Sequence, residues 1–312
     1  MKVKKFNKKE DYERIVNFLT EQYKLNKNMV CWLPERFDDL IFRIDTLYHD
    51  ERGLEKSQDY IYIFEDNNEI VGVVLPDGDS FNSCIKNGYE NIFGQMLDLS
   101  EKELQPLFER DGNGEINFLV VSHDSLGYQA EELQRRGYVR DEAGDFDNVQ
   151  HPLETNYTIN LPEGFKQVYG DEIDDNLKAK ACHYGFHPVD DDGILTGTFK
   201  EGALAYQGRK KSQFFDDSFE SLIVTDDGDI CAYCFCYVNK ELSTAFIEPL
   251  CTREKYRQKG FSKQMLYGVI NRLKEMGIES AYINSYDWRK KVYNSAGFET
   301  EDSIGFWHKK IR

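Results

Sequence analysis

The sequence stretch that decides the fold reads STAFIEPLCT at residues 243–252, REKYRQKGFSK at 253–263 and QMLYGVINRLKEMG at 264–277. Its first part is mostly apolar and predicts a strand. Its last part predicts an amphipathic helix, because apolar side chains recur there at helical spacing. These side chains are Met265, Leu266, Val269, Ile270, Leu273 and Met276. Gly277 follows where such a helix would stop, so the stretch predicts a strand, a turn and a helix in that order.

The turn within this stretch carries the residues with the clearest chemistry. Gly260 lets a ligand approach the backbone, and Arg257 and Lys259 add positive charge. We expect Ser262 to cap the helix. Free backbone N–H groups and the positive end of the helix dipole would face the same ligand. The turn is therefore predicted to bind an anion, and pyrophosphate is the natural one.

Length and composition limit the class of protein. The chain has 312 residues, which at roughly 150 residues per domain predicts two domains. Asp and Glu number 56 against 39 Lys and Arg, giving a net charge of −17, which disfavours binding to nucleic acid. A hydrophobic content of 40% with only 7 Pro and 23 Gly predicts a globular protein.

The cellular compartment is predicted from what the sequence lacks. No apolar stretch follows the basic first residues, as an export signal would require. The longest apolar run, residues 232–238, is far shorter than the ~20 residues that cross a bilayer. Seven cysteines form neither an even number nor a dense pattern, which is typical of a reducing compartment. We expect a cytoplasmic protein without contact to membranes.

Two landmarks recur in the chain at the same offset of 160 residues. The sequence FEDNNEIVGVV at 64–74 and the sequence VTDDGDICAYC at 224–234 both predict a hairpin. Gly137 and Gly297 each follow a predicted helix. The sequence therefore predicts a duplicated domain, each copy being an α/β (α+β) unit with a mixed, mostly antiparallel sheet flanked by helices. The turn signal LPEG at 161–164 places the two domains at 1–161 and 162–312.

Two motifs resemble the GNAT superfamily of N-acetyltransferases. The acetyl-CoA loop of that family reads Arg or Gln, two residues, Gly, one residue, then Gly or Ala, and Arg257, Gly260 and Ser262 stand at these positions. Ser262 is a small departure from that pattern. Tyr293 begins the sequence YNSAGF, which resembles the Tyr-x-x-x-Gly-Phe ending of the family. The resemblance covers residues 162–312 well, and the whole chain resembles a tandem GNAT pair.

The resemblance implies an acetyl-CoA site in the second copy alone. The residues expected to contact acetyl-CoA are Leu250, Cys251, Thr252, Arg257, Gln258, Lys259, Gly260, Phe261, Ser262 and Asn284. The first copy has residues 96–110 where the loop and helix should lie, and no Arg-x-x-Gly loop is found there. Leu133 stands at the position of Tyr293. We expect a degenerate first copy that walls the substrate cleft or stabilises the second.

The implied reaction, direct attack of an amine on the acetyl thioester, needs a base and an acid. Glu248 is the candidate base, because it lies next to Pro249, which lacks a ladder donor and predicts a bulge. Its alternative is a carboxylate that faces solvent or pairs with a lysine. Tyr293 resembles the GNAT acid that protonates the leaving thiolate. Its alternative is a tyrosine that packs on the sheet.

Three other patterns are interpreted as structural, so no metal is expected. Cys231, Cys234 and Cys236 lack a second cysteine pair and are predicted to pack in the core, with Cys231 facing opposite to the other two. His183 and His187 have zinc-helix spacing, but a glycine lies between them and no His-Glu-x-x-His motif is present, so they are predicted to be loop histidines. The segment 202–212 has the wrong spacing for a phosphate-binding P-loop.

The acceptor is not named by any motif. The acidic runs 190–192 and 216–217 are either solvated loops or a field that attracts cationic amines. We therefore expect a primary amine on a small, cationic molecule, bound by loops within residues 183–215, and a monomer or homodimer. One rival is a non-catalytic sensor or interaction protein that binds acyl-CoA. Another is an enzyme that transfers a longer acyl or an aminoacyl group.

Overall fold

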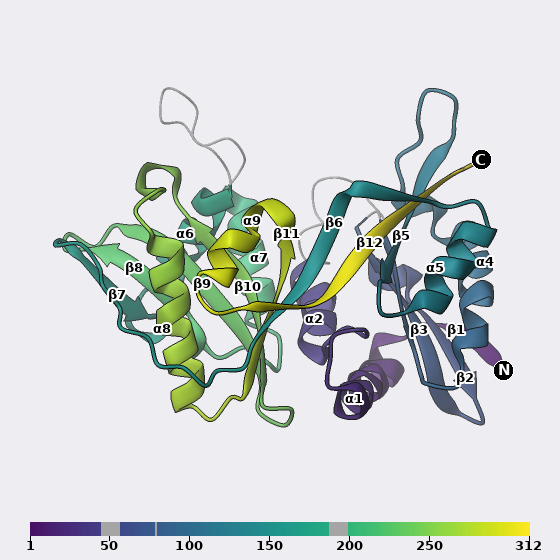
Figure 1. Ribbon diagram of the computed structural model, residues 1–312, viewed down its shortest axis with the longest axis horizontal. Coiled ribbons are helices and arrows are strands. Elements are labelled where there is room, and N and C mark those ends of the chain that lie inside the picture. Colours follow the sequence, from purple (N-terminus) through teal and green to yellow (C-terminus); the bar gives the residue numbers. More distant parts are fainter. Residues whose placement is uncertain (45–56, 79, 187–198) are drawn as a thin grey trace. The chain divides into compact units, whose positions relative to one another are not determined.

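The computed structural model describes residues 1–44, 57–78, 80–186 and 199–312, which form two compact units (Figure 1). The N-terminal unit comprises Met1–Ile41, Tyr48–Asn148 and Glu301–Arg312, and the C-terminal unit comprises Phe42–Leu47 and Val149–Thr300. None of the described helices has both the length and the apolar character needed to cross a membrane.

The N-terminal unit contains a mixed sheet with helices. Its strands are β1 (Lys2–Lys5), β2 (Tyr62–Asp66), β3 (Glu69–Asp77), β4 (Ser80–Ile85), β5 (Ile116–His123), the first part of β6 (Val139–His151) and most of β12 (Glu299–Ile311). Its helices are α1 (Lys8–Asn26), α2 (Pro34–Asp39), α4 (Phe93–Glu103) and α5 (Gly127–Arg135). Strands β1 to β4 pair antiparallel in chain order, and β4 pairs with β5 in parallel.

The C-terminal unit repeats this arrangement. Its strands are β7 (Phe165–Tyr169), β8 (Ser221–Thr225), β9 (Ile230–Asn239), β10 (Thr244–Thr252) and β11 (Ser280–Tyr286). Its helices are α6 (Asp175–Phe186), α7 (Phe199–Arg209), α8 (Phe261–Glu275) and α9 (Asp287–Asn294). Strands β7 to β10 again pair antiparallel, and β10 pairs with β11 in parallel. The mixed α/β class predicted from the sequence is confirmed.

The landmarks that suggested a duplication adopt matching conformations. The two predicted hairpins are β2–β3 and β8–β9. Gly137 and Gly297 follow α5 and α9 with φ values of 80° and 90°, in the left-handed region that favours glycine. The turn and helix-end residues that the two sequence copies share therefore predict the repeated hairpin and helix.

The boundary between the two compact units differs from the domain boundary predicted after Leu161, because the last strand, β12, belongs mostly to the N-terminal unit. Residues 304–311 of β12 pair antiparallel with 116–123 of β5, and Trp307 is buried in the N-terminal core. The cut at 161/162 remains a prediction of where the second sequence copy begins. The N-terminal unit also holds a disulfide between Cys31 and Cys84, which the cysteine count did not predict.

The sheet of the C-terminal unit has a distinct helix layer on each face. Cys234 and Cys236 share a core cluster with Met265 of α8 and with Tyr293 of α9. Side chains alternate along a strand, so Phe235 faces the other side, where it packs on Phe215 with ring centroids 5.1 Å apart. Helices α6 and α7 belong to that other layer, because Tyr206 of α7 packs on Phe215 with ring centroids 6.4 Å apart and α6 contacts α7.

Two details of α8 differ from the sequence prediction. Met276 was expected on the apolar face, but α8 ends at Glu275 and Met276 is 44% exposed, because the chain turns away at Gly277. Ser262 was expected to cap the helix, but Gly260 occupies the N-cap position, with a φ of 78°. The predicted apolar face is otherwise buried.

Candidate functional site

Strands β10 and β11 separate near the centre of the C-terminal sheet. Their parallel pairing includes only residues 244–246 with 280–282, although both strands continue beyond these residues. On the other side of β10, the register with β9 shifts between Ile247 and Leu250. This confirms the bulge predicted at Pro249. The separation leaves an opening in the sheet at the end of β10 that leads to the loop before α8.

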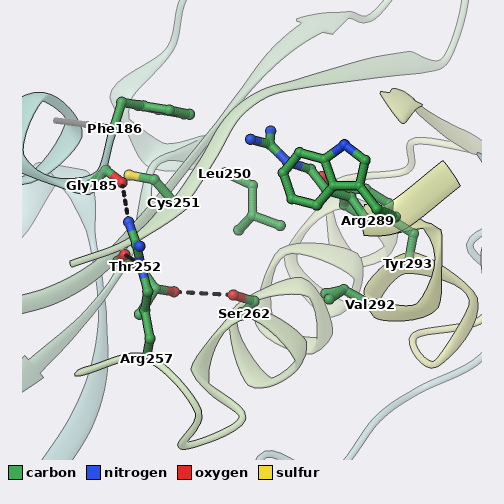
Figure 2. Close-up of a pocket in the computed structure, with 11 residues that line it drawn as sticks. Gly185, Phe186, Leu250, Cys251, Thr252, Arg257, Ser262, Arg289, Val292 and Tyr293 are labelled. Carbon is green, nitrogen blue, oxygen red and sulfur yellow. Dashed lines mark hydrogen bonds between the residues drawn. The ribbon is translucent and has the colours of Figure 1, made fainter. Parts of the chain in front are cut away.

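A cavity of about 340 Å³ lies at this opening (Figure 2). Its lining comes from α6, β10, the start of α8 and α9. The lining residues are Gly185, Phe186, Leu250, Cys251, Thr252, Arg257, Ser262, Trp288, Arg289, Val292 and Tyr293. Six of the residues predicted from the sequence therefore surround one cavity.

A neighbouring cavity of about 420 Å³ lies along the loop before α8. Its lining residues are Thr252, Tyr256, Arg257, Gln258, Gly260, Phe261, Ser262, Lys263, Lys291, Val292 and Ser295. The two cavities share Thr252, Arg257, Ser262 and Val292. Together they form a groove from the turn to Tyr293.

The loop before α8 presents unused backbone donors to this groove. The first backbone hydrogen bond of the helix runs from Gln264 N–H to Gly260 O, at 3.2 Å. The amides of residues 258–263 therefore have no acceptor within the described parts of the chain. Gln258 and Gly260 both have positive φ, 62° and 78°, and space is open around Gly260. These free amides at a helix N-terminus fit a pyrophosphate.

Side chains around the loop are held by hydrogen bonds. The Arg257 guanidinium donates to Thr252 O at 3.1 Å and to Gly185 O at 3.2 Å (Figure 2). Ser262 is the second residue of α8 and so cannot be its N-cap, and its hydroxyl lies 3.0 Å from the Thr252 hydroxyl. Lys259 is exposed, with Nζ 5.4 Å from the centroid of the Phe165 ring. The positive charge is thus placed beside the free amides.

Tyr293 lies at the inner end of the groove. Its side chain belongs to the core cluster and is 7% exposed, yet it lines the first cavity. Burial, with a smaller contribution from the Glu248 carboxylate, raises the pKa of Tyr293 to about 12. The phenol is therefore protonated throughout the neutral pH range. A protonated phenol beside a cavity is able to donate a proton.

Glu248 lies on β10 at the bulge. Its side chain is 33% exposed, and its carboxylate forms an ion pair with Arg43, with a nitrogen–oxygen distance of 3.4 Å. Glu248 lines neither of the two cavities. It is close enough to Tyr293 to contribute to the pKa of that phenol. The sequence suggested a lysine as a possible partner, and the ion pair found here is with an arginine.

Several predicted residues lie away from the groove. Asn284 is partly exposed on β11 and lines neither cavity. His183 lies buried on α6 rather than in the predicted loop. His187 and the acidic run 190–192 lie outside the described residues. Asp216 accepts a hydrogen bond from Ser218 N–H at 3.0 Å and so caps a short helical turn. The segment rejected as a P-loop, 202–212, forms most of α7 and the turn after it.

The cysteine interpretation needs one correction. Cys231, Cys234 and Cys236 are all buried in β9, in agreement with packing. Cys231 was expected to face opposite to the other two, but all three belong to the same core cluster. The register between β8 and β9 shifts next to Cys231, between Ile223 and Val224, which interrupts the alternation.

Sequence reasoning missed the contributions of α6 and of the outer face of α9. Trp288, Val292 and Ser295 recur at the i, i+4, i+7 spacing of one helix face. That spacing, together with two apolar residues in an otherwise polar helix, could have predicted that this face of α9 lines a site. Gly185 and Phe186 carried no comparable signal, because their position depends on how α6 crosses β10.

Comparison with known proteins identifies the class of protein to which this fold and groove belong. Residues 166–298 match the model of the acetyltransferase (GNAT) family. No curated protein matches the sequence. The C-terminal half of the chain therefore belongs to the GNAT family of acetyltransferases, whose members typically use acetyl-CoA.

Solved structures extend the likeness of fold to the whole chain. A GCN5-related N-acetyltransferase from Sphaerobacter thermophilus is 15% identical, with a TM-score of 0.64 and coverage of 100% of this chain and 96% of that chain. A tandem GNAT protein from the clavulanic acid biosynthesis pathway is 12% identical, with a TM-score of 0.56 and coverage of 88% and 94%. A GNAT-family acetyltransferase from Colwellia psychrerythraea is 11% identical, with a TM-score of 0.55 and coverage of 99% of both chains. The chain thus has a tandem GNAT fold.

Proposed function

We propose that the C-terminal unit transfers an acetyl group directly from acetyl-CoA to a primary amine of a small, cationic molecule. The observation that carries the proposal is the row of free amides at residues 258–263, placed at one end of a groove that reaches the buried Tyr293. One end of the groove suits a pyrophosphate, and the other has a proton donor suited to a leaving thiolate.

The chain's own residues supply binding and proton transfer in this proposal. The amides of 258–263, with Arg257 and Lys259, bind the pyrophosphate, while Leu250, Cys251 and Thr252 flank the pantetheine arm. Acetyl-CoA supplies the activated thioester. Glu248, directly or through a water, removes a proton from the ammonium of the acceptor, and Tyr293 protonates the departing thiolate. The net charge of −17 favours a cationic acceptor.

Release of free thiol from acetyl-CoA in the presence of amines tests the proposal. We expect a panel of polyamines, aminoglycosides and lysine derivatives to include at least one acceptor that accelerates thiol release and gains an acetyl group by mass. Anionic amines of similar size serve as the control panel. If acetyl-CoA binds but no amine accelerates thiol release, the protein is a sensor rather than an enzyme.

Replacing Glu248 with glutamine is expected to lower turnover about tenfold or more at neutral pH, since general base catalysis contributes at least that much. Affinity for acetyl-CoA should change little, because Glu248 lines neither cavity. Steady-state kinetics with the acceptor found above, together with calorimetric titration of acetyl-CoA, give both quantities.

Arg43→Gln is the matched control for Glu248→Gln. Both changes break the ion pair between Arg43 and Glu248, but only one removes the carboxylate. Turnover of the Arg43→Gln variant should therefore stay within a few-fold of wild type. An equal loss in the two variants would show that Glu248 acts through the ion pair and is not the base.

A further inference from the structure

Arg209, at the end of α7, is a buried cation without a carboxylate partner among the residues that the structure describes. It is only 3% exposed, and its Nε atom has no hydrogen-bond partner. In the described parts of the chain no Asp or Glu forms an ion pair with it. A buried guanidinium without a counter-charge is costly. A negative charge beside Arg209 would offset this cost.

The thiol of Cys182 lies close enough to Arg209 to carry this negative charge. Arg209 Nη1 lies 3.8 Å from Cys182 Sγ, in position to donate a hydrogen bond to a thiolate. A hydrogen bond from the Cys251 thiol lowers the pKa of Cys182 most, and the charge of Arg209 lowers it further, against the effect of burial. Arg43 adds a second positive charge nearby. Cys182 thus has the environment of a stabilised thiolate.

Cys251 lies beside Cys182 because α6 packs closely against β10. A Cβ atom on Gly185 would lie 2.3 Å from Cys251 Sγ, so only glycine allows this approach. Cys251 Sγ lies 3.8 Å from Ala181 O and 3.9 Å from Cys182 O, which directs it to the turn of α6 that carries Cys182. Cys182 is partly exposed and Cys251 is buried. The pair therefore combines a thiol beside a buried cation, on a partly exposed residue, with an adjacent buried thiol.

We propose that Cys182 and Cys251 form a modification site at which hydrogen peroxide converts the two thiols into an intramolecular disulfide. An accessible thiolate next to a resolving cysteine is the arrangement of a redox-sensitive pair. The inference does not depend on the proposed acetyl transfer.

The chemistry requires only hydrogen peroxide as oxidant. The Cys182 thiolate attacks one peroxide oxygen, so an S–O bond forms, the O–O bond breaks, and hydroxide leaves and takes up a proton. Cys182 becomes a sulfenic acid. The Cys251 sulfur then attacks Cys182 Sγ, an S–S bond forms, the S–O bond breaks, and the oxygen leaves as water with the proton that Cys251 loses. The two sulfurs together lose two electrons, and one peroxide is reduced to two waters.

Mass spectrometry of the full-length protein tests the site directly. Protein treated with a small molar excess of hydrogen peroxide is blocked with iodoacetamide and digested without reduction. We expect a peptide pair linked through Cys182 and Cys251, and the natural Cys31–Cys84 pair serves as an internal reference for recovery. If both thiols are still free while Cys231, Cys234 or Cys236 has become oxidised, the proposal is wrong.

Three variants separate the roles of the two cysteines and Arg209. Cys251→Ser should retain a sulfenic acid on Cys182 that dimedone traps, whereas Cys182→Ser should give neither a trapped adduct nor a linked pair. Cys234→Ser, at a buried cysteine of the same unit, should still form the link. Arg209→Gln should slow oxidation of Cys182 about tenfold through loss of thiolate. An unchanged rate in a folded Arg209→Gln protein would contradict the role of Arg209.

Discussion

Replacing Gly260 with aspartate is expected to abolish measurable binding of acetyl-CoA. The residue lies at the N-cap of α8, beside the free amides of 258–263, and space is open around it. A carboxylate there would occupy the anion site and repel a pyrophosphate. At a separation near ~4 Å and an effective dielectric constant of about 20, that repulsion is about 4 kcal/mol, or roughly 1,000-fold in affinity. Calorimetric titration of acetyl-CoA into both proteins measures the difference.

Gly277→Asp is a matched control on the same helix. Gly277 also has a φ of 78°, and no atom lies within 4 Å of a Cβ added there. The control therefore introduces the same charge and the same backbone strain at the other end of α8. It should lose at least as much stability as Gly260→Asp, because a carboxylate is unfavourable at the C-terminal end of a helix, and it should keep its affinity for acetyl-CoA. Weak binding by wild type and both variants would contradict an anion site at the turn.

The parts of the fold that were predictable depend on local conformation. The glycines at 137 and 297 end helices because of their own φ preference, and the hairpins are set by short turns. A local sequence pattern therefore predicts these helix ends and hairpins well. The pairing of β12 with β5 joins residues such as Trp307 and Val120 that lie far apart in sequence. Nothing in the local pattern of β12 specifies its partner strand.

The same distinction applies to the candidate site. The turn at Gly260 and the helix after it were predictable, since a strand, a glycine and a helix start are neighbours in sequence. The place of Cys251 beside Cys182 was not, because it depends on Gly185 allowing α6 to approach β10. Arg209 reaches Cys182 from a third element. These contacts arise from packing between distant segments and carry no sequence motif.

Replacing Tyr293 with phenylalanine is expected to lower turnover by about 100-fold, the lower range for loss of a general acid. Affinity for acetyl-CoA should change by less than about twofold, since the ring that packs in the core is retained. With a pKa of about 12, the wild-type phenol stays protonated as pH rises from 7 to 10. Turnover of the wild type should therefore show no loss from Tyr293 over that range.

Tyr267→Phe is the control for Tyr293→Phe, because Tyr267 lies on α8, stacks on Tyr157 at 4.2 Å between ring centroids and lines neither cavity. Its turnover should equal that of wild type. If the Tyr293 phenol only packs, the two variants will behave alike. If it donates the proton, the loss in Tyr293→Phe should shrink with a donor whose thiol has a lower pKa, since such a thiolate leaves without protonation. That dependence on the leaving group distinguishes a proton donor from a tyrosine that merely shapes the cavity.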